Sequence, residues 1–299
     1  MSTAEAWTIG KLLTWTTDYL KKHGSPSPRL DAEVLLAHAR NCQRIELYTT
    51  FAEEPSDETK TAFREMVRRR AEGTPVAYLV GHKEFYSATF EVNPDVLIPR
   101  PETEHLIVEA LDRAKQLRHA RGAADAPLNI ADVGTGSGII ALIMAKHCPH
   151  CTVTAVDISP AALEVARRNA AKFEIAEERV RFVLGDLLTA CQPEERFDMI
   201  LSNPPYVSQS EYEQLDVSVR EYEPQGALVA GESGAETIVR LLQQAPDCLA
   251  ADGWVVLEFS PMLAGQIERW LPAGWKPPVI TKDYAGLARI AALQRIQQP

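Results

Sequence analysis

Short strand-like segments and longer helix-like segments alternate over residues 128–259, and this alternation restricts the fold of the 299-residue chain more than any other feature. The short apolar runs are typical of buried strands, and the longer runs have helical spacing. The predicted strands are Leu128–Val133, Thr152–Val156, Val180–Leu184, Phe197–Leu201 and Trp254–Phe259, and the predicted helices lie near 138–147, 160–173 and 235–250. This order predicts a parallel sheet with helices on both faces.

Two further β-rich runs, Pro278–Thr281 and Ala288–Leu293, follow the last predicted helix. They predict an antiparallel pair at one edge of the sheet. We therefore expect an α/β fold with a seven-stranded, mostly parallel, Rossmann-like sheet.

The N-terminal part, residues 3–70, carries no strand signal, and its apolar residues recur at helical spacing, as in Ile9, Leu12 and Leu13 and again in Leu30, Val34 and Leu35. The segment Ser25-Pro26-Ser27-Pro28 ends one helix and begins the next, and Pro55-Ser56 does the same before 62–71. These signals predict a bundle of short helices in a domain of residues 1–75. A structural cap and a docking module are equally good interpretations of it.

The period changes around Gly73-Thr74-Pro75, where a connector of residues 76–100 begins. Residues 82–98 predict a β-hairpin with its turn at Ser87-Ala88. A helix is expected from Pro101 to about Leu117, because proline suits the first helical position and acids such as Glu102 and Glu104 suit the first turn. The third domain, residues 101–299, then contains the sheet.

The net charge of −10 comes from 41 acidic and 31 basic residues. Residues 1–80 hold 11 of each, so the rest of the chain carries the whole acidic excess. This distribution disfavours broad electrostatic binding to a nucleic-acid backbone.

Five cysteines are scattered through a chain that is too large to need disulfides, which indicates a reducing compartment. Cys148 and Cys151 have the spacing of half a zinc site, but no second Cys/His pair accompanies them, and no metal site is predicted. The N-terminus has no early basic cluster or apolar core of a targeting signal, and no apolar run is long enough to span a membrane. We expect a cytoplasmic protein without membrane contact.

The first sheet strand is followed at once by Gly134-Thr135-Gly136-Ser137-Gly138 and a helix. Alternate glycines permit a sharp turn and a close approach of a ligand to the backbone. The spacing is neither the dinucleotide fingerprint nor a phosphate loop with its lysine. It indicates a ligand site, with a purely structural turn as the alternative.

Acidic residues end the next two predicted strands. Asp157 is placed to accept hydrogen bonds from the two hydroxyls of a ribose. Asp186 could accept from an adenine amine while Leu187 packs near the ring, or Asp186 could simply cap a helix.

The fourth strand leads into Asn203-Pro204-Pro205-Tyr206. The two prolines end the strand and hold the backbone rigid. The side-chain oxygen of Asn203 and the carbonyl of Pro204 can then accept both hydrogens of a planar NH₂ group, against which Tyr206 could stack. We predict that this tetrad binds the substrate, with Asn203, Pro204 and Tyr206 acting in catalysis.

The glycine-rich loop, Asp157 and the tetrad together resemble class I S-adenosylmethionine-dependent methyltransferases that act on a planar nitrogen. Further segments resemble the peptide chain release factor glutamine methyltransferases over nearly the whole chain. These segments are Pro28–Leu36, Gly73–Gly81, Glu84-Phe85-Tyr86 and Leu97–Glu104.

The resemblance implies a helical N-terminal domain that helps to recognise the release factor, and a glutamine acceptor in the factor's Gly-Gly-Gln loop. It also implies S-adenosylmethionine as cofactor, with its methionine portion at Gly134–Gly138, its ribose at Asp157 and its adenine at Asp186 and Leu187. Asn203 is expected to contact the cofactor as well as the substrate. Arg100 and Glu102 either shape the rim of the site or form a salt bridge within the connector.

Two other functions remain open at this point. An adenine-N6 methyltransferase acting on DNA or RNA would use the same acceptors for a flipped base. A non-catalytic adaptor would bind a nucleoside ligand without turnover. For the glutamine methyltransferase we expect release factors as partners, no stable nucleic-acid complex and a monomer.

Overall fold

The computed structural model describes residues 6–192 and 194–296, and these fall into two compact units. The helical unit comprises the described residues up to His82 together with Asp216–Tyr222. The sheet unit comprises the remaining described residues from Lys83 onward. Within the described residues, no helix is both long enough and apolar enough to cross a membrane.

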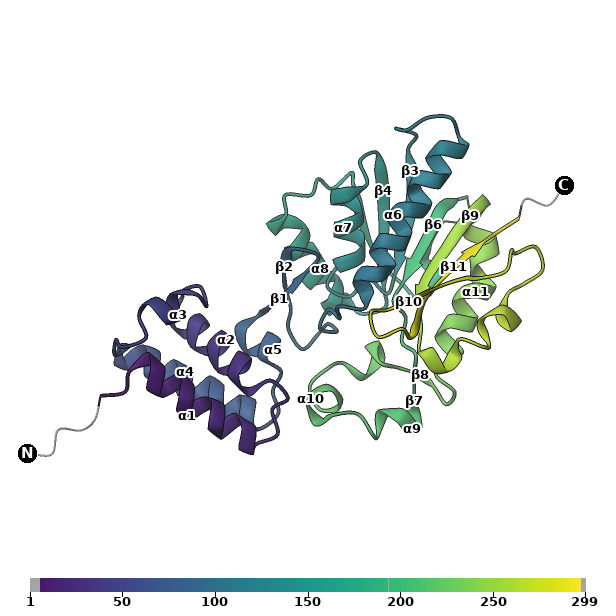
Figure 1. The fold of residues 1–299 in the computed structure, drawn as a ribbon. Coiled ribbons are helices and arrows are strands. Elements are labelled where there is room, and N and C mark those ends of the chain that lie inside the picture. The colour runs from purple at the N-terminus through teal and green to yellow at the C-terminus, as the bar shows by residue number, and fades with distance from the viewer. Residues whose placement is uncertain (1–5, 193, 297–299) are drawn as a thin grey trace, which may run out of the picture. The chain divides into compact units, whose positions relative to one another are not determined.

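The helical unit confirms the expected bundle of short helices (Figure 1). Its helices are α1 (Ile9–Lys22), α2 (Pro28–Arg40), α3 (Glu46–Thr49), α4 (Asp57–Ala71), α5 (Val76–Val80) and α10 (Val217–Arg220). The hydroxyl of Ser56 accepts from the Thr59 N–H at 3.2 Å and so begins α4, as Pro55-Ser56 predicted. Leu13 and Leu35 are fully buried in the bundle core, whereas Leu30 is 44% exposed despite its helical spacing.

The segment Asp216–Tyr222 belongs to the helical unit through contacts at the end of α4. The hydroxyl of Tyr222 donates to the Glu72 carbonyl at 3.0 Å. A Cβ atom at Gly73, where φ is +107°, would lie only 3.3 Å from the Tyr222 ring. Glycine at this position therefore serves both the positive φ and the close approach of the ring.

The connector hairpin consists of β1 (His82–Phe85) and β2 (Ala88–Glu91). Its turn is Tyr86-Ser87 and not the expected Ser87-Ala88, and no strand continues after Glu91 to residue 98. Both turn residues have positive φ, 48° and 58°, as in a type I′ turn. The side chain of Glu104 stabilises this turn by accepting from the Tyr86 N–H at 2.9 Å.

The sheet unit is built on seven strands in the order β10-β11-β9-β6-β3-β4-β5. The strands are β3 (Leu128–Val133), β4 (Cys151–Asp157), β5 (Val180–Leu184), β6 (Phe197–Ser202), β9 (Leu249–Glu258), β10 (Val279–Lys282) and β11 (Ala288–Gln294). The first five run parallel, and β11 pairs antiparallel with both β9 and β10. The predicted fold class and antiparallel edge pair are confirmed.

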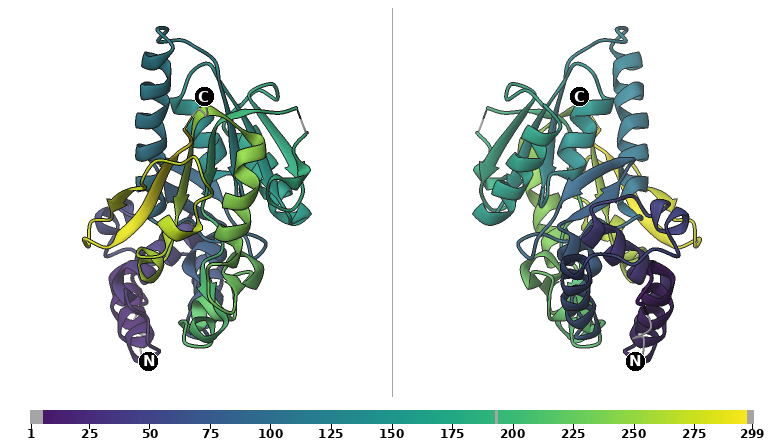
Figure 2. Two further views of the ribbon diagram at one scale, coloured as in Figure 1. Left: turned by 90° about the vertical axis from the view of Figure 1, so that its right-hand side faces the viewer. Right: turned by 90° about the vertical axis from the view of Figure 1, so that its left-hand side faces the viewer.

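Helices cover both faces of this sheet. The helices α6 (Thr103–Ala120), α7 (Ile139–His147) and α8 (Pro160–Lys172) bury one face, and α11 (Glu236–Cys248) buries the other. Figure 2 shows the long blue-teal α6 and the yellow-green α11 on opposite sides of the sheet. Along β3, Ile130 faces the side covered by α6, α7 and α8, and Ala131 faces α11, as the alternation of side chains in a strand requires.

Short elements link these parts of the sheet unit. They are the strands β7 (Val207–Ser208) and β8 (Val229–Gly231), the helix α9 (Gln209–Tyr212), and the 3₁₀ turns η1 (Leu187–Ala190), η2 (Gln225–Ala227), η3 (Pro261–Leu263) and η4 (Ile267–Trp270).

The register of the parallel strands determines which loops meet. Val133, the last residue of β3, lies opposite Val156 of β4 and Ser202 of β6. The residues that follow these three positions therefore leave the sheet at the same edge.

Asn169 of α8 joins the connector hairpin to the glycine-rich loop. Its side-chain oxygen accepts from the Glu91 N–H at 2.7 Å, and its side-chain nitrogen donates to the carbonyls of Glu91 and Ser137 at 3.0 and 2.9 Å. The side chain is fully buried. One amide thus satisfies backbone groups of both the connector hairpin and the glycine-rich loop.

We expect Asn169→Ala to lower the free energy of unfolding of the sheet unit by about 3 kcal/mol, because it leaves backbone groups buried without partners. Urea denaturation, followed by fluorescence, measures this change. Asn129→Ala is the matched control: its exposed side chain makes one hydrogen bond, to Thr152, and we expect a change within about 0.5 kcal/mol. A loss below about 1 kcal/mol for Asn169→Ala would contradict this account.

Candidate active site

A cleft of about 320 Å³ lies at the edge where β3, β4 and β6 end. The structure brings nine of the predicted site residues to its lining: Gly134, Thr135, Gly136, Ser137, Asp157, Asp186, Leu187, Asn203 and Pro205. Gly138, Pro204 and Tyr206 are not part of the lining. All of these residues belong to the sheet unit.

The glycine-rich loop has positive φ at Gly134 (74°), Gly136 (56°) and Gly138 (85°). A Cβ atom at Gly136 would meet nothing within 4 Å, so this backbone borders open space. A Cβ atom at Gly138 would lie 3.1 Å from Leu142 and 3.2 Å from Ala166. Gly138 therefore permits the packing of α7 against α8, which explains why it does not line the cleft.

Asp132, at the end of β3, lies fully buried under this loop. One carboxylate oxygen accepts from the Thr135 hydroxyl at 2.6 Å and from the Ala141 N–H at 3.0 Å. The other oxygen has no partner among the described residues. Burial raises the pKa of Asp132 to about 7. The sequence motif contained Asp132, but its spacing did not indicate that this carboxylate would hold the glycine-rich loop by hydrogen bonds.

Asp157 holds the other side of the loop. Its two carboxylate oxygens accept from the backbone N–H groups of Gly136 at 2.8 Å and Ser159 at 2.9 Å. Burial raises the pKa of Asp157, and these backbone hydrogen bonds oppose the shift. Each carboxylate oxygen can accept more than one hydrogen bond, so both can still bind hydroxyls in the cleft.

Asp186 also lines the cleft, but its carboxylate is paired with a cation. Its carboxylate forms an ion pair with Arg240 of α11 at 2.5 Å and is 44% exposed. It precedes the short turn η1 but makes no side-chain cap hydrogen bond. The alternative role of helix capping therefore has no hydrogen bond to support it, while Arg240 shares the carboxylate.

The tetrad is connected to a buried carboxylate. The side-chain nitrogen of Asn203 donates to the hydroxyl of Thr103 at 3.1 Å, and that hydroxyl donates to Glu258 at 2.7 Å. The phenol of Tyr206 donates to the other oxygen of Glu258 at 2.9 Å. Thr103 begins α6 and Glu258 ends β9, and sequence reasoning missed both.

Burial dominates the electrostatics of this network. It raises the pKa of Glu258, against the effect of the two hydroxyl donors. It also raises the pKa of Tyr206, and the neighbouring charge of Glu258 adds to that shift. The ring of Tyr206 packs against the apolar cluster on the α11 face of the sheet. Its proposed stacking on a substrate stays a prediction.

Arg100 lines the cleft and is fixed from behind by Glu223, whose side chain is buried. The second oxygen of Glu223 accepts from the Ile98 N–H at 3.0 Å. The connector is therefore held by an ion pair, but the partner lies outside it. Glu102 is instead the residue before α6 and does not line the cleft.

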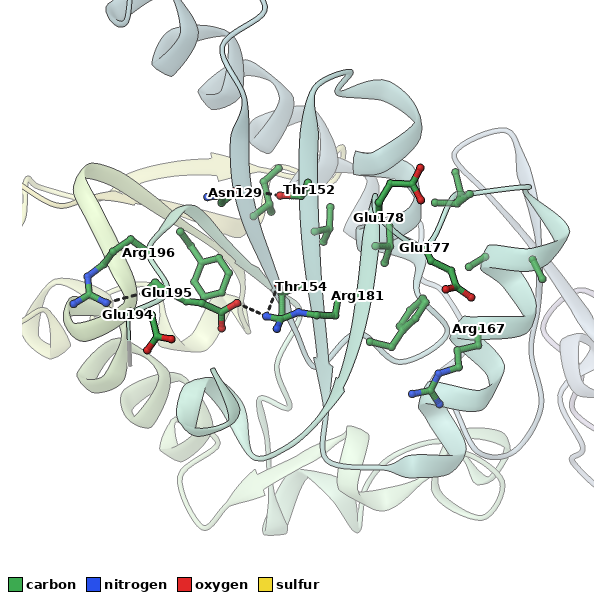
Figure 3. Close-up of a pocket in the computed structure, with 18 residues that line it drawn as sticks. Asn129, Thr152, Thr154, Arg167, Glu177, Glu178, Arg181, Glu194, Glu195 and Arg196 are labelled. Carbon is green, nitrogen blue, oxygen red and sulfur yellow. Dashed lines mark hydrogen bonds and ion pairs between the residues drawn. The ribbon is translucent and has the colours of Figure 1, made fainter. Parts of the chain in front are cut away.

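A second cleft, of about 990 Å³, runs beside the edge strand β5 and contains none of the predicted site residues. Figure 3 shows that Arg181 points toward Thr154 and Glu195, with which it forms a hydrogen bond and an ion pair. Arg181 and Glu195 of this lining thus neutralise each other. Across the described parts of the chain, no group of three or more His, Cys, Asp or Glu residues is placed to hold a metal ion.

The sheet order, its antiparallel end and the cleft at the parallel strand ends are the features of a Rossmann-like methyltransferase fold. The family profile "Methyltransferase small domain" matches residues 108–222, and "PrmC N-terminal domain" matches residues 11–81. The catalytic domain of hMettl16 shares the fold with a TM-score of 0.56 and 15% identity, over 78% of this chain and 83% of that one.

Two curated relatives are named "Release factor glutamine methyltransferase". The protein from Rhodopirellula baltica is 50% identical over 97% of both chains. The protein from Koribacter versatilis is 40% identical over 91% of this chain and 93% of its own. The chain belongs to the release factor glutamine methyltransferase family.

S-adenosylmethionine is the cofactor of this class, and the cleft suits it. The open space beside Gly136 would be filled by any side chain there, as expected where a ligand contacts the backbone. The carboxylate of Asp157 offers acceptors to ribose hydroxyls within the same cleft. These two features meet the chemical needs of a sulfonium nucleoside.

We expect Asp157→Ala to weaken S-adenosylmethionine binding about 10- to 100-fold, because it removes charged acceptors for the ribose and the support of Gly136. Isothermal titration calorimetry measures the dissociation constant. Asp125→Ala, at an exposed position away from the cleft, is the matched control and should bind normally. Equal affinity of Asp157→Ala and the unmodified protein would refute this role.

The raised pKa of Asp132 predicts a pH dependence of stability. Between its ordinary pKa of 3.8 and about 7, the folded protein keeps a proton that the unfolded chain has lost. This contribution to the free energy of unfolding is therefore present at low pH and is lost as the pH rises through that range.

Asp132→Asn cannot titrate, so we compare it with the unmodified protein by urea denaturation at pH 5 and pH 8. From pH 5 to pH 8, the free energy of unfolding of the unmodified protein should fall by about 3 kcal/mol more than that of Asp132→Asn. A constant difference across this range would show that the Asp132 carboxyl does not titrate there.

Proposed function

We propose that this protein methylates the side-chain amide nitrogen of the glutamine in the Gly-Gly-Gln motif of peptide chain release factors, with S-adenosylmethionine as methyl donor. Family membership supports this function over the adenine-N6 alternative. The main chemical support for this function is the orientation of the Asn203 side chain. Its nitrogen donates a hydrogen bond to Thr103, which leaves its oxygen as an acceptor at the cleft.

An amide nitrogen is a weak nucleophile because its lone pair is delocalised into the carbonyl group. The oxygen of Asn203 and the carbonyl of Pro204 accept the two amide hydrogens and so orient the nitrogen. Bound S-adenosylmethionine supplies an electrophilic methyl group. Holding two reactants in line can lower a barrier by about 7–11 kcal/mol, so this site needs no strong general base.

The roles of the remaining predicted residues follow from their places in the cleft. Gly134–Ser137 receives the methionine portion of the cofactor, Asp157 binds its ribose, and Asp186 and Leu187 bind its adenine, whereas Gly138 serves the packing of α7 against α8. Pro205 lines the acceptor side beside Asn203. Tyr206 contributes by holding the tetrad through Glu258 as well as by any contact with the substrate.

The wider biology follows from the same proposal. The helical unit contributes to recognition of the release factor, and the acidic excess of the chain disfavours a stable complex with nucleic acid. The free cysteines fit a cytoplasmic enzyme. We propose that it works as a monomer, without membrane contact.

Asn203→Ala should lower the rate of methyl transfer at least about 100-fold, because it removes an acceptor that acts on the reacting nitrogen. Calorimetry should find S-adenosylmethionine binding within about 3-fold of normal, since Asp157 and the glycine loop are unchanged. Mass spectrometry of purified release factors after reaction detects one added methyl group on the Gly-Gly-Gln glutamine.

Labelled cofactor distinguishes the possible acceptors in the same assay. Label in the release factor and not in duplex DNA supports the proposal. Label in DNA alone would overturn it, and near-normal transfer by Asn203→Ala would overturn the role of that residue.

A further inference from the structure

The hydroxyl of Thr103 can settle the orientation of a neighbouring amide because it carries a single hydrogen. That hydrogen is donated to Glu258 at 2.7 Å, so only a lone pair of the Thr103 oxygen faces Asn203. Position 203 must therefore present a donor, which is the side-chain nitrogen at 3.1 Å. The amide oxygen consequently points the other way.

The surroundings prevent water from replacing these partners. Thr103 is fully buried and Glu258 is 1% exposed. Glu258 accepts from Tyr206 on its other oxygen, so an ionised Glu258 receives a donor on each side. An ionised carboxylate has no hydrogen to donate and cannot reverse the direction of the Thr103 hydrogen bond.

We propose that Thr103 and Glu258 are positioning residues that hold the Asn203 carboxamide with its oxygen toward the acceptor nitrogen, and so make the site selective for an NH₂ group. This inference rests on the proposed function. A flipped Asn203 amide would turn its own NH₂ toward the substrate NH₂, two donors with no acceptor between them. The buried Glu258 therefore acts on the reaction through Thr103, without touching the substrate.

The arrangement also explains why two distant segments work together. Thr103 lies in the segment Leu97–Glu104 and follows Arg100, which is anchored by Glu223. The N–H of Thr103 donates to the Arg100 carbonyl at 3.1 Å, so the backbone that carries the hydroxyl is itself fixed. The last residue of the connector, Arg100, thus helps to fix the start of α6, which supplies the group that orients the tetrad.

Thr103→Val removes the hydroxyl with little change in shape and should lower kcat about 10- to 100-fold, the effect of losing one oriented hydrogen bond in the reaction. The KM for release factor and the affinity for S-adenosylmethionine should stay within about 3-fold. Thr103→Ser keeps the hydroxyl and should restore kcat to within about 5-fold of normal.

A double-mutant cycle separates action through Thr103 from an independent effect of Glu258. Glu258→Gln alone should lower kcat about as much as Thr103→Val, because an amide can donate to Thr103 and release its hydrogen toward Asn203. In the Thr103→Val background, Glu258→Gln should lower kcat by less than about 3-fold more. Independent structural damage would instead multiply the two effects.

Thr154→Val is the matched control. Thr154 is a buried threonine that accepts a hydrogen bond from Arg181 beside the second cleft, so this variant should keep normal kcat. Cofactor affinity, measured for every variant, reports whether the fold of the cleft is intact, and Thr103→Ser gives a reading even where Thr103→Val is unstable.

Normal kcat in Thr103→Val, a Thr103→Ser variant no faster than Thr103→Val, or multiplied effects in the cycle would each overturn the positioning role. Failure of the proposed function gives a different result, since the unmodified protein would then not methylate release factor. In that case the same variants are compared on the acceptor that takes the label, duplex DNA, whose adenine also presents a planar NH₂ group.

Discussion

The register of three parallel strands is the constraint on which the rest of the sheet unit depends. Val133 lies opposite both Val156 and Ser202, so β3, β4 and β6 end together. The glycine-rich loop, Asp157 and Asn203 are the next residues along each strand, and they reach one cleft for that reason alone. A shift of one residue would turn every side chain of a strand to the opposite face, which the apolar packing on both faces prevents.

Two buried carboxylates lie at this edge of the sheet, and their charges lower the stability of the folded state. Burial raises the pKa of both Asp132 and Glu258, which means that each charge destabilises the folded state relative to its protonated form. Asp132 receives hydrogen bonds on one oxygen only, whereas Glu258 receives one on each. Glu258 is thus better satisfied, in agreement with a role that needs the ionised form in one fixed geometry.

The sequence predicted the elements of the sheet well because their signals are local. Buried parallel strands are short apolar runs, and β3 and β5 have the bounds that those runs indicate. The hairpin turn was misplaced because its local signal is missing: Tyr86 and Ser87 adopt positive φ without glycine or asparagine. A hydrogen bond from a distant part of the chain, at Glu104, stabilises that turn, and no local signal records it.

Some residues of the candidate site could likewise be predicted from local sequence signals, and others could not. Residues that follow strand ends could be found from spacing, because parallel strands bring their carboxyl ends to one edge. Thr103 and Glu258 could not, since each is an ordinary residue within its own segment and gains a role only by meeting Asn203 and Tyr206. Their hydrogen bonds join positions 100 and 155 residues apart.

The position of Tyr206 bears on which residues of the tetrad can recognise a substrate. Its phenol is bound by Glu258 and its ring packs against the apolar cluster, so the residue is held by the protein itself. Pro204 is buried between two residues that line the cleft, and Pro205 lines it. We propose that discrimination among planar nitrogen acceptors depends on the oxygens of Asn203 and Pro204 and on the fit of the cleft, more than on an aromatic surface. A carboxamide, which offers two hydrogens but only a small planar face, is the acceptor that such a site suits.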